Sequence, residues 1–225
     1  MKSKLGFAAA ILIMLLLAGC GSTKEAGDTG LLSKLTEGRY SELEVREYEG
    51  TKLDPSGALP ENSISGVQQV DISSYVLEVT GSVQQPVSLA YEEVLALPAY
   101  EKLITLHCVE GWDATVLWKG ALLKDIIAPA VVRETAQTVI FHCVDGYTSS
   151  LPLQAVIDKE MILAYSSNGI TLPPSLGFPF IVVAEDRLGY KWARWVNEIE
   201  LSDDPYLTGF WENRGLDSEA DIPAN

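Results

Sequence analysis

Apolar and polar residues alternate in several separate stretches of the chain, as is typical of half-buried β-strands. The clearest stretch is residues 75–79 (YVLEV), which lead into a turn at Gly81. The predicted strands are residues 75–79, 103–108, 138–143, 178–184 and 195–201.

Two segments between these strands have helical features. Ser88 is placed to cap a helix over residues 88–97, and Pro98 ends it because proline cannot continue a helix. A second helix is expected over residues 120–127. Strands of mixed spacing with short helices between them favour an α+β fold with mixed β-sheets over a regular βαβ repeat.

The first twenty residues have the features of a bacterial lipoprotein leader. Lys2 and Lys4 precede an apolar run over residues 5–17, and small residues precede Cys20 in the segment 17–20 (LAGC). The run is short for a membrane helix and indicates a signal peptide. We expect lipidation of Cys20 to anchor the mature protein to the extracytoplasmic face of the cell membrane.

Composition divides the remaining chain into a tether and one domain. Residues 21–66 are rich in Gly, Ser, Thr, Glu and Lys and have few clustered apolar residues, although residues 40–48 alternate enough to pack on the domain. The expected parts are a signal peptide over residues 1–19, the lipidated Cys20 with a tether over residues 20–66, and a folded domain with a C-terminal tail over residues 67–225.

The chain is acidic, with a formal charge of −15. Removal of the leader would take away Lys2 and Lys4 and bring the charge to −17. A nucleic-acid partner requires a basic patch that neutralises phosphates, and the sequence offers none. The acidity is better explained by solubility and by low adhesion to an anionic membrane.

The chain has two histidines, and each directly precedes a cysteine, in residues 106–112 (LHCVEGW) and 141–147 (FHCVDGY). Both cysteines are followed by a valine, an acid, a glycine and an aromatic residue, so we expect each strand to leave its sheet in a tight turn. Neighbouring side chains on a strand point to opposite faces. If both cysteines face a pocket, both histidines face away from it.

This alternation argues against a zinc site of two cysteines and two histidines, and against a cysteine nucleophile activated by its neighbouring histidine. Cys108 and Cys143 could instead form a disulfide, because an exported protein meets an oxidising compartment. A soft-metal ligand or simple core filling are further possibilities. Spacing alone leaves these alternatives open.

A series of short motifs follows in order between residues 75 and 215. They are residues 77–83 (LEVTGSV), 108–112 (CVEGW), 118–120 (WKG), 145–147 (DGY), 163–165 (LAY), 168–169 (NG), 172–174 (LPP), 177–179 (GFP), 191–195 (KWARW) and 209–212 (GFWE). In this order and spacing they resemble the oxidoreductase molybdopterin-binding domain of the sulfite oxidase family.

The resemblance implies a sulfite-oxidase-type fold and an oxidoreductase that moves an oxygen atom to or from a small sulfur or nitrogen oxide, or a sulfoxide. In that family one cysteine thiolate binds molybdenum beside the dithiolene of molybdopterin, and Cys108 matches it. The chain has no Cys-x-x-Cys-His motif, so electrons would be exchanged with a separate haem or quinone protein.

The resemblance also implies roles for residues around Cys108. Cys143 matches a position that lines the cofactor, and Asp145 and Tyr147 would help to shape the same pocket. The basic cluster that holds the pterin phosphate in the family is matched by Lys191, the Trp192 backbone and Arg194.

Two features depart from the family pattern. Ile181 stands where many members carry an arginine after the Gly-Phe-Pro turn. The leader lacks the Arg-Arg pair with which cofactor-loaded enzymes are exported in the folded state. The alternative interpretation is a cofactor-free lipoprotein that keeps this fold and binds a ligand in its pocket.

Overall fold

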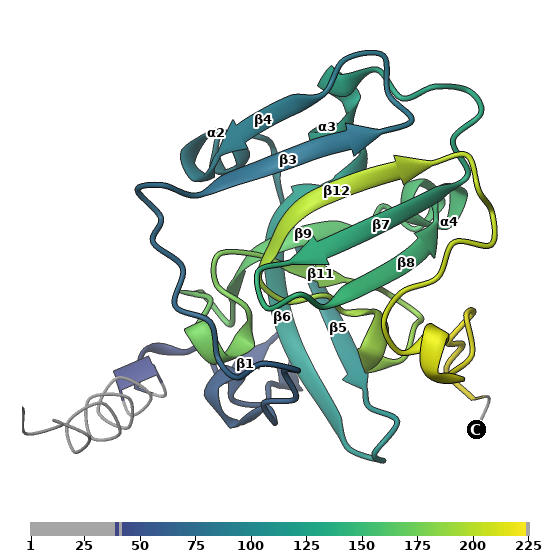
Figure 1. Ribbon diagram of the computed structural model, residues 1–225. Coiled ribbons are helices and arrows are strands. Elements are labelled where there is room, and N and C mark those ends of the chain that lie inside the picture. The colour runs from purple at the N-terminus through teal and green to yellow at the C-terminus, as the bar shows by residue number, and fades with distance from the viewer. Residues whose placement is uncertain (1–38, 41, 224–225) are drawn as a thin grey trace, which may run out of the picture.

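A computed structural model describes residues 39–40 and 42–223 of the chain (Figure 1). The expected signal peptide and Cys20 lie outside the described residues. Two five-stranded sheets form the body, and a hairpin of β1 (Glu47–Tyr48) and β2 (Thr51–Lys52) precedes them. None of the described helices is long and apolar enough to cross a bilayer.

The first sheet has the strand order β10-β9-β6-β5, and β11 also pairs with β9. All of its strand pairs are antiparallel, and β5 and β6 form a long hairpin. Its strands are β5 (Ala99–His107), β6 (Asp113–Leu122), β9 (Ile162–Ser167), β10 (Ile170–Thr171) and β11 (Ile181–Val183).

The second sheet has the order β4-β3-β12-β7-β8 and is mixed, because β12 runs parallel to β3 and antiparallel to β7. Its strands are β3 (Val76–Gly81), β4 (Val87–Ala90), β7 (Thr138–Cys143), β8 (Thr148–Pro152) and β12 (Val196–Ser202). In β3, Leu77 and Val79 are fully buried and alternate with Glu78 and Thr80, as a sheet with one core-facing side requires. The α+β prediction is confirmed.

Short helices connect these strands. The α-helices are α2 (Tyr91–Leu95), α3 (Leu123–Ile127) and α4 (Leu153–Asp158), and the 3-10 helices are η1 (Ser56–Ala58), η2 (Ala128–Ala130), η3 (Pro174–Leu176), η4 (Gly189–Lys191) and η5 (Glu212–Arg214). The three α-helices have only five or six residues each, which explains why the sequence shows no strong helical periodicity.

The predicted helix over residues 88–97 is wrong at its start. Ser88 lies in β4 and donates its hydroxyl to Glu78 across the strand pair at 2.6 Å, so it caps nothing. Helix α2 begins at Tyr91, where the Glu93 carboxylate accepts the backbone N–H of Ala90 at 2.8 Å. A carboxylate in the first helical turn thus provides the stabilisation expected from serine.

The predicted helix over residues 120–127 is also too long, because Gly120 belongs to β6 and the helix begins at Leu123. β6 itself was not predicted. A Cβ at Gly120 would lie 2.1 Å from the backbone oxygen of Leu163, so glycine is required for the approach of β9.

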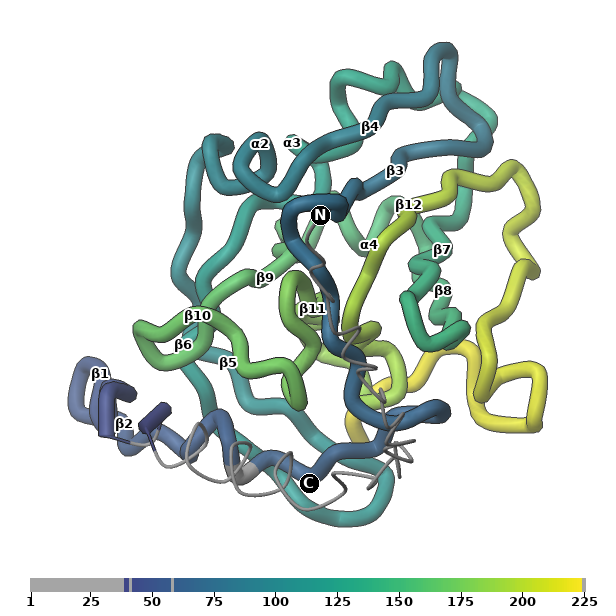
Figure 2. Tube along the Cα trace, turned by 60° about the vertical axis from the view of Figure 1, so that its left-hand side comes forward, coloured from purple at the N-terminus to yellow at the C-terminus, as the bar shows by residue number. Residues whose placement is uncertain are grey.

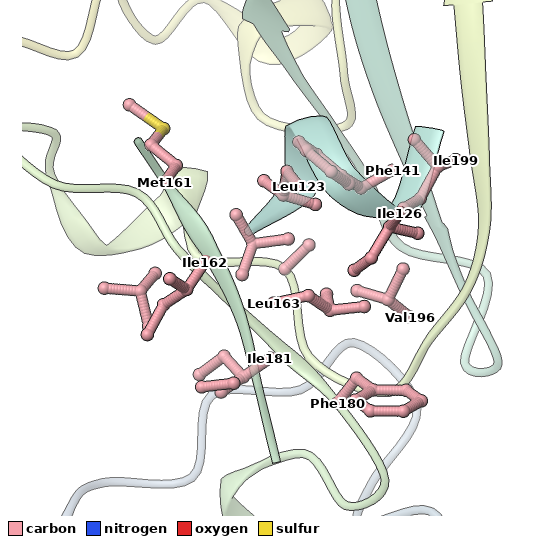
Figure 3. Packing of buried hydrophobic residues seen from close by; sticks show 14 of the residues in the cluster. Leu123, Ile126, Phe141, Met161, Ile162, Leu163, Phe180, Ile181, Val196 and Ile199 are labelled. Carbon is pink, nitrogen blue, oxygen red and sulfur yellow. The ribbon is translucent and has the colours of Figure 1, made fainter. Parts of the chain in front are cut away.

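Side chains from both sheets meet in one hydrophobic core (Figure 3). Leu163 of β9 and Ile181 of β11 come from the first sheet, and Phe141 of β7 and Ile199 of β12 from the second; all four are fully buried. Burial of a side chain of this size contributes roughly 1.5–3 kcal/mol. The core that positions the site therefore contains the late strands that the sequence predicted.

Part of the segment that was expected as a tether packs on the domain. Leu53 and Leu59 are buried, and the Asn168 side chain donates to the backbone oxygen of Asp54 at 2.8 Å. In Figure 2 this segment runs along the lower edge of the molecule before the chain turns up toward β3. Contacts with the domain therefore begin well before Val67.

Candidate functional site

A cavity of about 400 Å³ lies where the turns after β5 and β7 meet η4. This volume is in the range of pockets that hold small molecules or cofactors. Two further walls come from segments that are far apart in the sequence, residues 62–64 and residues 211–216. The cavity is thus built by loops at strand ends, which a rigid sheet pair holds in place.

The turns that carry the two cysteines have the same backbone geometry. In each one the cysteine N–H donates to the backbone oxygen of the aromatic residue four positions later, at 2.9 Å after Cys108 and 3.0 Å after Cys143. Gly111 and Gly146 both adopt positive φ angles, +85° and +86°. The sequence repeat therefore encodes one turn twice, with glycine at the position that favours it.

Cys108 lines the cavity and is half-buried, with its Sγ 4.0 Å from a carboxylate oxygen of Glu110. Burial raises the pKa of its thiol, and the nearby charge of Arg194 lowers it in part. The sulfur is therefore a thiol that a metal ion can reach and deprotonate.

Cys143 belongs to the hydrophobic core and is not among the described residues that line the cavity. Burial raises the pKa of its thiol well above the usual value, and the charge of Asp145 adds to this effect. The expectation that Cys143 contacts the cofactor has no support in this placement. Cys108 and Cys143 are both free thiols in the structure.

Asp145, Tyr147 and Trp192 all line the cavity. The Asp145 carboxylate accepts the backbone N–H of Tyr147 at 3.0 Å and fixes the turn. The Tyr147 hydroxyl donates to the backbone oxygen of Tyr190, and burial raises its pKa. The Trp192 indole donates to the backbone oxygen of Arg187 at 3.1 Å, so its ring is held in one orientation.

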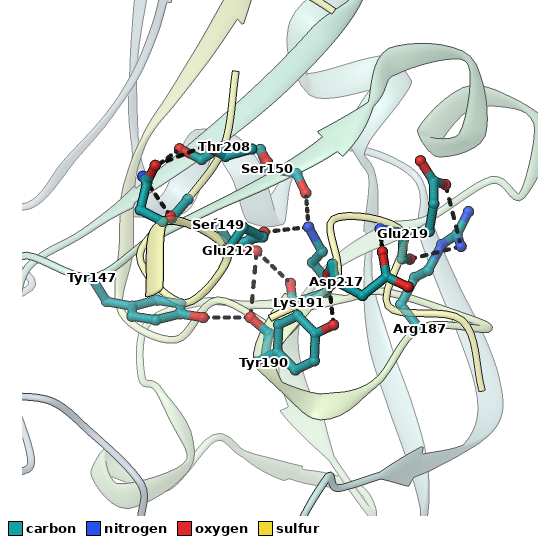
Figure 4. Close-up of polar contacts among 12 residues, drawn as sticks. Tyr147, Ser149, Ser150, Arg187, Tyr190, Lys191, Thr208, Glu212, Asp217 and Glu219 are labelled. Carbon is teal, nitrogen blue, oxygen red and sulfur yellow. Dashed lines mark hydrogen bonds and ion pairs between the residues drawn. The ribbon is translucent and has the colours of Figure 1, made fainter. Parts of the chain in front are cut away.

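Lys191 lies outside the cavity lining and is almost fully buried (Figure 4). Its ammonium group forms an ion pair with Glu212 and donates to the backbone oxygen of Ser150 at 2.9 Å. Burial lowers the pKa of Lys191, and the Glu212 carboxylate counteracts this shift. In this placement the Glu212 carboxylate neutralises the charge of Lys191, so the expected contact of Lys191 with the cofactor phosphate has no support here.

Arg194 lines the cavity. Its guanidinium donates to the backbone oxygens of Ser175, at 3.1 Å, and Pro60, at 3.3 Å. Burial lowers its pKa from the usual value. Carbonyl oxygens orient the group and leave its positive charge without a neutralising carboxylate at ion-pair distance among the described residues.

Both histidines bind carboxylates. His107 pairs with Asp113 at 2.7 Å and His142 with Glu200 at 2.8 Å, each on a neighbouring strand. Within residues 39–40 and 42–223, no group of three or more His, Cys, Asp or Glu side chains is arranged to hold a metal ion. The repeated His-Cys pairs do not form a shared site there.

Several lining residues were missed by the sequence reasoning. Asn62 belongs to the segment that was expected as a tether, while Trp211, Arg214 and Leu216 belong to the C-terminal end. The one available signal was the aromatic cluster in residues 209–215 (GFWENRG), which suggested packing on the domain but no place on it.

Comparison with known proteins identifies the family. The family model for the oxidoreductase molybdopterin binding domain matches residues 64–211, about two thirds of the chain. The chain belongs to the oxidoreductase molybdopterin-binding family. The resemblance based on the short motifs is therefore confirmed, and so is the relation to sulfite oxidases.

Three relatives of this chain show the range of similarity. The uncharacterized oxidoreductase YuiH of Bacillus subtilis is 36% identical over 152 residues, which cover 67% of this chain and 76% of that protein. The putative protein-methionine-sulfoxide reductase subunit YedZ1 of Azospira oryzae is 31% identical over 66% of this chain and 56% of its own length. Rat mitochondrial sulfite oxidase is 30% identical over 66% of this chain, but this match spans only 32% of that enzyme.

A solved structure has a similar fold. The sulfane dehydrogenase SoxCD from Paracoccus pantotrophus superimposes with a TM-score of 0.60 and 20% identity, over 85% of this chain and 58% of that chain. At this identity the likeness concerns the fold alone. It agrees with the antiparallel sheet, the mixed sheet and the short helices described above.

Proposed function

We propose that this protein is a membrane-tethered, extracytoplasmic molybdopterin oxidoreductase that transfers an oxygen atom to or from a small sulfur or nitrogen oxide, or a sulfoxide. The observation that carries this proposal is the half-buried Cys108 thiol in the wall of a 400 Å³ cavity of a molybdopterin-binding domain. The names of two relatives, a sulfite oxidase and a protein-methionine-sulfoxide reductase subunit, support this substrate class.

The cavity residues fit the cofactor in most respects. Cys108 offers the soft sulfur donor that molybdenum needs. Trp112 and Trp192 provide flat apolar walls that suit a fused ring, and Arg194 offers a cation for an anionic group. Lys191 does not fit a phosphate-binding role, because its charge is already compensated.

When bound, molybdenum supplies two-electron oxygen-atom transfer. The protein must first provide a thiolate. The pKa of Cys108 is raised, so its thiol would have to lose a proton to hold a metal ion, and the Glu110 carboxylate, 4.0 Å from Sγ, is placed to accept it. The same carboxylate accepts the indole N–H of Trp112 at 3.3 Å, which holds it beside the sulfur.

The proposed location and redox partner rest on other observations. Lipidation of Cys20 after removal of residues 1–19 would place the domain outside the cytoplasm, on a tether from the membrane. Fractionation of the native host tests this placement. The chain has no haem-binding motif and one relative is named a subunit, so we infer a separate haem or quinone protein as the electron partner.

Metal analysis of protein from the native host tests the proposal. We expect molybdenum and pterin fluorescence in the wild-type protein, and loss of most bound molybdenum in Cys108→Ser. Cys143→Ala is the matched control, because it removes a thiol that does not line the cavity. Wild-type protein without molybdenum and pterin, or Cys108→Ser with full metal content, would contradict the assignment.

The Lys191–Glu212 ion pair favours a second candidate function. With Lys191 compensated and Ile181 buried in β11, fewer cations face the cavity than the family resemblance implies. The second candidate is a cofactor-free ligand-binding lipoprotein with the same fold. A Cys108–Cys143 disulfide in protein isolated from the host would support this candidate and exclude metal ligation by Cys108.

A further inference from the structure

Residues 206–223, here called the C-terminal strap, supply one wall of the cavity. They are tied to the segment around η4 by the buried Lys191–Glu212 ion pair (Figure 4). Further bonds to the same segment run from the Tyr190 hydroxyl to the backbone oxygen of Asp217, at 2.7 Å, and from the Leu188 N–H to Ala220, at 2.8 Å. The strap therefore has a fixed position beside the cavity.

Arg214 is the cation that this strap brings to the cavity. Its guanidinium lies 3.4 Å from the ring centroid of Phe210 and donates to the backbone oxygen of the same residue at 2.7 Å. Stacking and one hydrogen bond orient the planar group. An arginine has five N–H donors, so most of those of Arg214 remain unused among the described residues.

The cavity is lined by two carboxylates, Glu110 and Asp145, and two arginines, Arg194 and Arg214. Glu110 and Asp145 each accept hydrogen bonds from N–H groups. Arg194 and Arg214 bind backbone oxygens, and neither forms an ion pair with a carboxylate in the described part of the chain. Glu61 acts on Arg194 only through a longer-range electrostatic interaction. The two oriented guanidinium groups therefore remain available for hydrogen bonds to an anionic ligand.

We propose that Arg214 is an anion-binding residue of this cavity and recognises an oxyanion through its unused N–H donors. The oxyanion is either a free substrate ion or the phosphate monoester of the pterin; only the second source rests on the function proposed above. The strap then determines ligand selectivity, because it supplies this cation from outside the two sheets.

Tryptophan fluorescence gives a direct test in the cofactor-free full-length protein. Four of the five tryptophans, Trp112, Trp192, Trp195 and Trp211, line the cavity. Sodium sulfate is the probe, titrated at constant ionic strength. We expect saturable binding that weakens about tenfold or more in Arg214→Gln, because one charge-assisted contact is lost.

Two variants separate binding from folding and from net charge. Arg214→Lys should keep much of the sulfate affinity, since it retains the charge but not the planar fork. Arg133→Gln removes an arginine that also donates to a backbone oxygen, that of Val83 at 2.9 Å, but lies away from this cavity. This matched control should bind sulfate like the wild type, and thermal unfolding should show that Arg214→Gln is folded.

A second measurement distinguishes the two sources of the anion. The molybdopterin content of protein from the native host, measured by fluorescence of the oxidised pterin, should fall in Arg214→Gln if the pterin phosphate is the ligand. If the content is unchanged while sulfate binding weakens, the ligand is a free oxyanion. Wild-type protein without pterin defeats the proposed enzyme but leaves the sulfate test intact. The Arg214 proposal is overturned if neither sulfate affinity nor pterin content depends on Arg214.

Discussion

Cys108 and Cys143 occupy the same position in two copies of one turn, but they meet different surroundings. Cys108 is half-buried at the cavity, whereas Cys143 is packed in the core. The turn is a local property, since it depends on Gly111, Gly146 and nearby hydrogen bonds, and the sequence repeat predicted it. How deeply each sulfur is buried depends on how the two sheets pack together, and a local sequence pattern carries no information about that packing.

Replacement of Gly120 should be costly at the residue scale. The new Cβ of Gly120→Ala would meet the backbone oxygen of Leu163 at 2.1 Å, so β6 and β9 would have to separate. We expect a loss of roughly 1–3 kcal/mol in the free energy of unfolding, measured by urea denaturation. Gly57→Ala, where the new Cβ has no neighbour within 4 Å, is the control and should unfold like the wild type. Equal stability of both variants would show that the strands adjust freely.

The strands could be predicted from the sequence to different degrees. The segment 138–143 coincides with β7, and the segment 195–201 differs from β12 by one residue at each end. β6 was not predicted, because its residues 116–118 and 120–122 are all buried and the strand therefore lacks the alternation that marks a half-buried strand.

The candidate site was predictable only where it is local in sequence. Cys108, Asp145 and Tyr147 belong to turns that the repeat marks, and all three line the cavity. The partner of Lys191 was not predictable, because Glu212 comes from a separate element and reaches it only through the fold. The sequence therefore shows that a positive charge lies near the motif, but only the tertiary structure shows which group that charge pairs with.

The Lys191–Glu212 pair should be critical for joining η4 to η5. Glu212→Gln keeps the shape of the side chain but leaves the ammonium group buried without a counter-charge, which typically costs about 3–5 kcal/mol. Deprotonation of Lys191, whose pKa burial already lowers, would reduce this cost at alkaline pH. Urea denaturation at pH 7 and pH 9 measures both effects.

Two controls accompany this prediction. The double variant Lys191→Met with Glu212→Leu removes both charges and should be much more stable than Glu212→Gln. Glu160→Gln breaks the exposed Lys124–Glu160 pair and should cost much less stability than Glu212→Gln, because solvent screens that pair. If Glu212→Gln is as stable as Glu160→Gln, the buried pair does not hold the strap.

Acid should weaken the whole molecule through exposed carboxylates whose pKa values are lowered in the folded state. Hydrogen bonds from Ser82 and Thr135 lower the pKa of Asp203 below its usual 3.8, and a hydrogen bond from Lys124 lowers that of Glu160 below 4.5. The unfolded chain therefore takes up protons at higher pH than the folded chain. The stability from these groups is present above about pH 4.5 and is lost as the pH falls through the lowered values.

Urea midpoints measured from pH 7 down to pH 2.5 check this dependence. Asp203→Asn should be less stable than the wild type at neutral pH, and the difference should shrink below pH 3.8, where the wild-type carboxyl begins to bind a proton. A difference that stays constant over this range would assign the effect of the substitution to something other than charge.

Asn62 and Arg214 stand near opposite ends of the described chain, yet both line one cavity. On the ribosome the first of these walls emerges long before the last, so a nascent chain has nothing to enclose a ligand until residues 211–216 have been added. A ligand that contacts all of these walls can therefore be fully enclosed only once residues 211–216 are present. A chain that terminates before Trp211 would contain every strand of both sheets but would lack one wall of the cavity and the buried partner of Lys191.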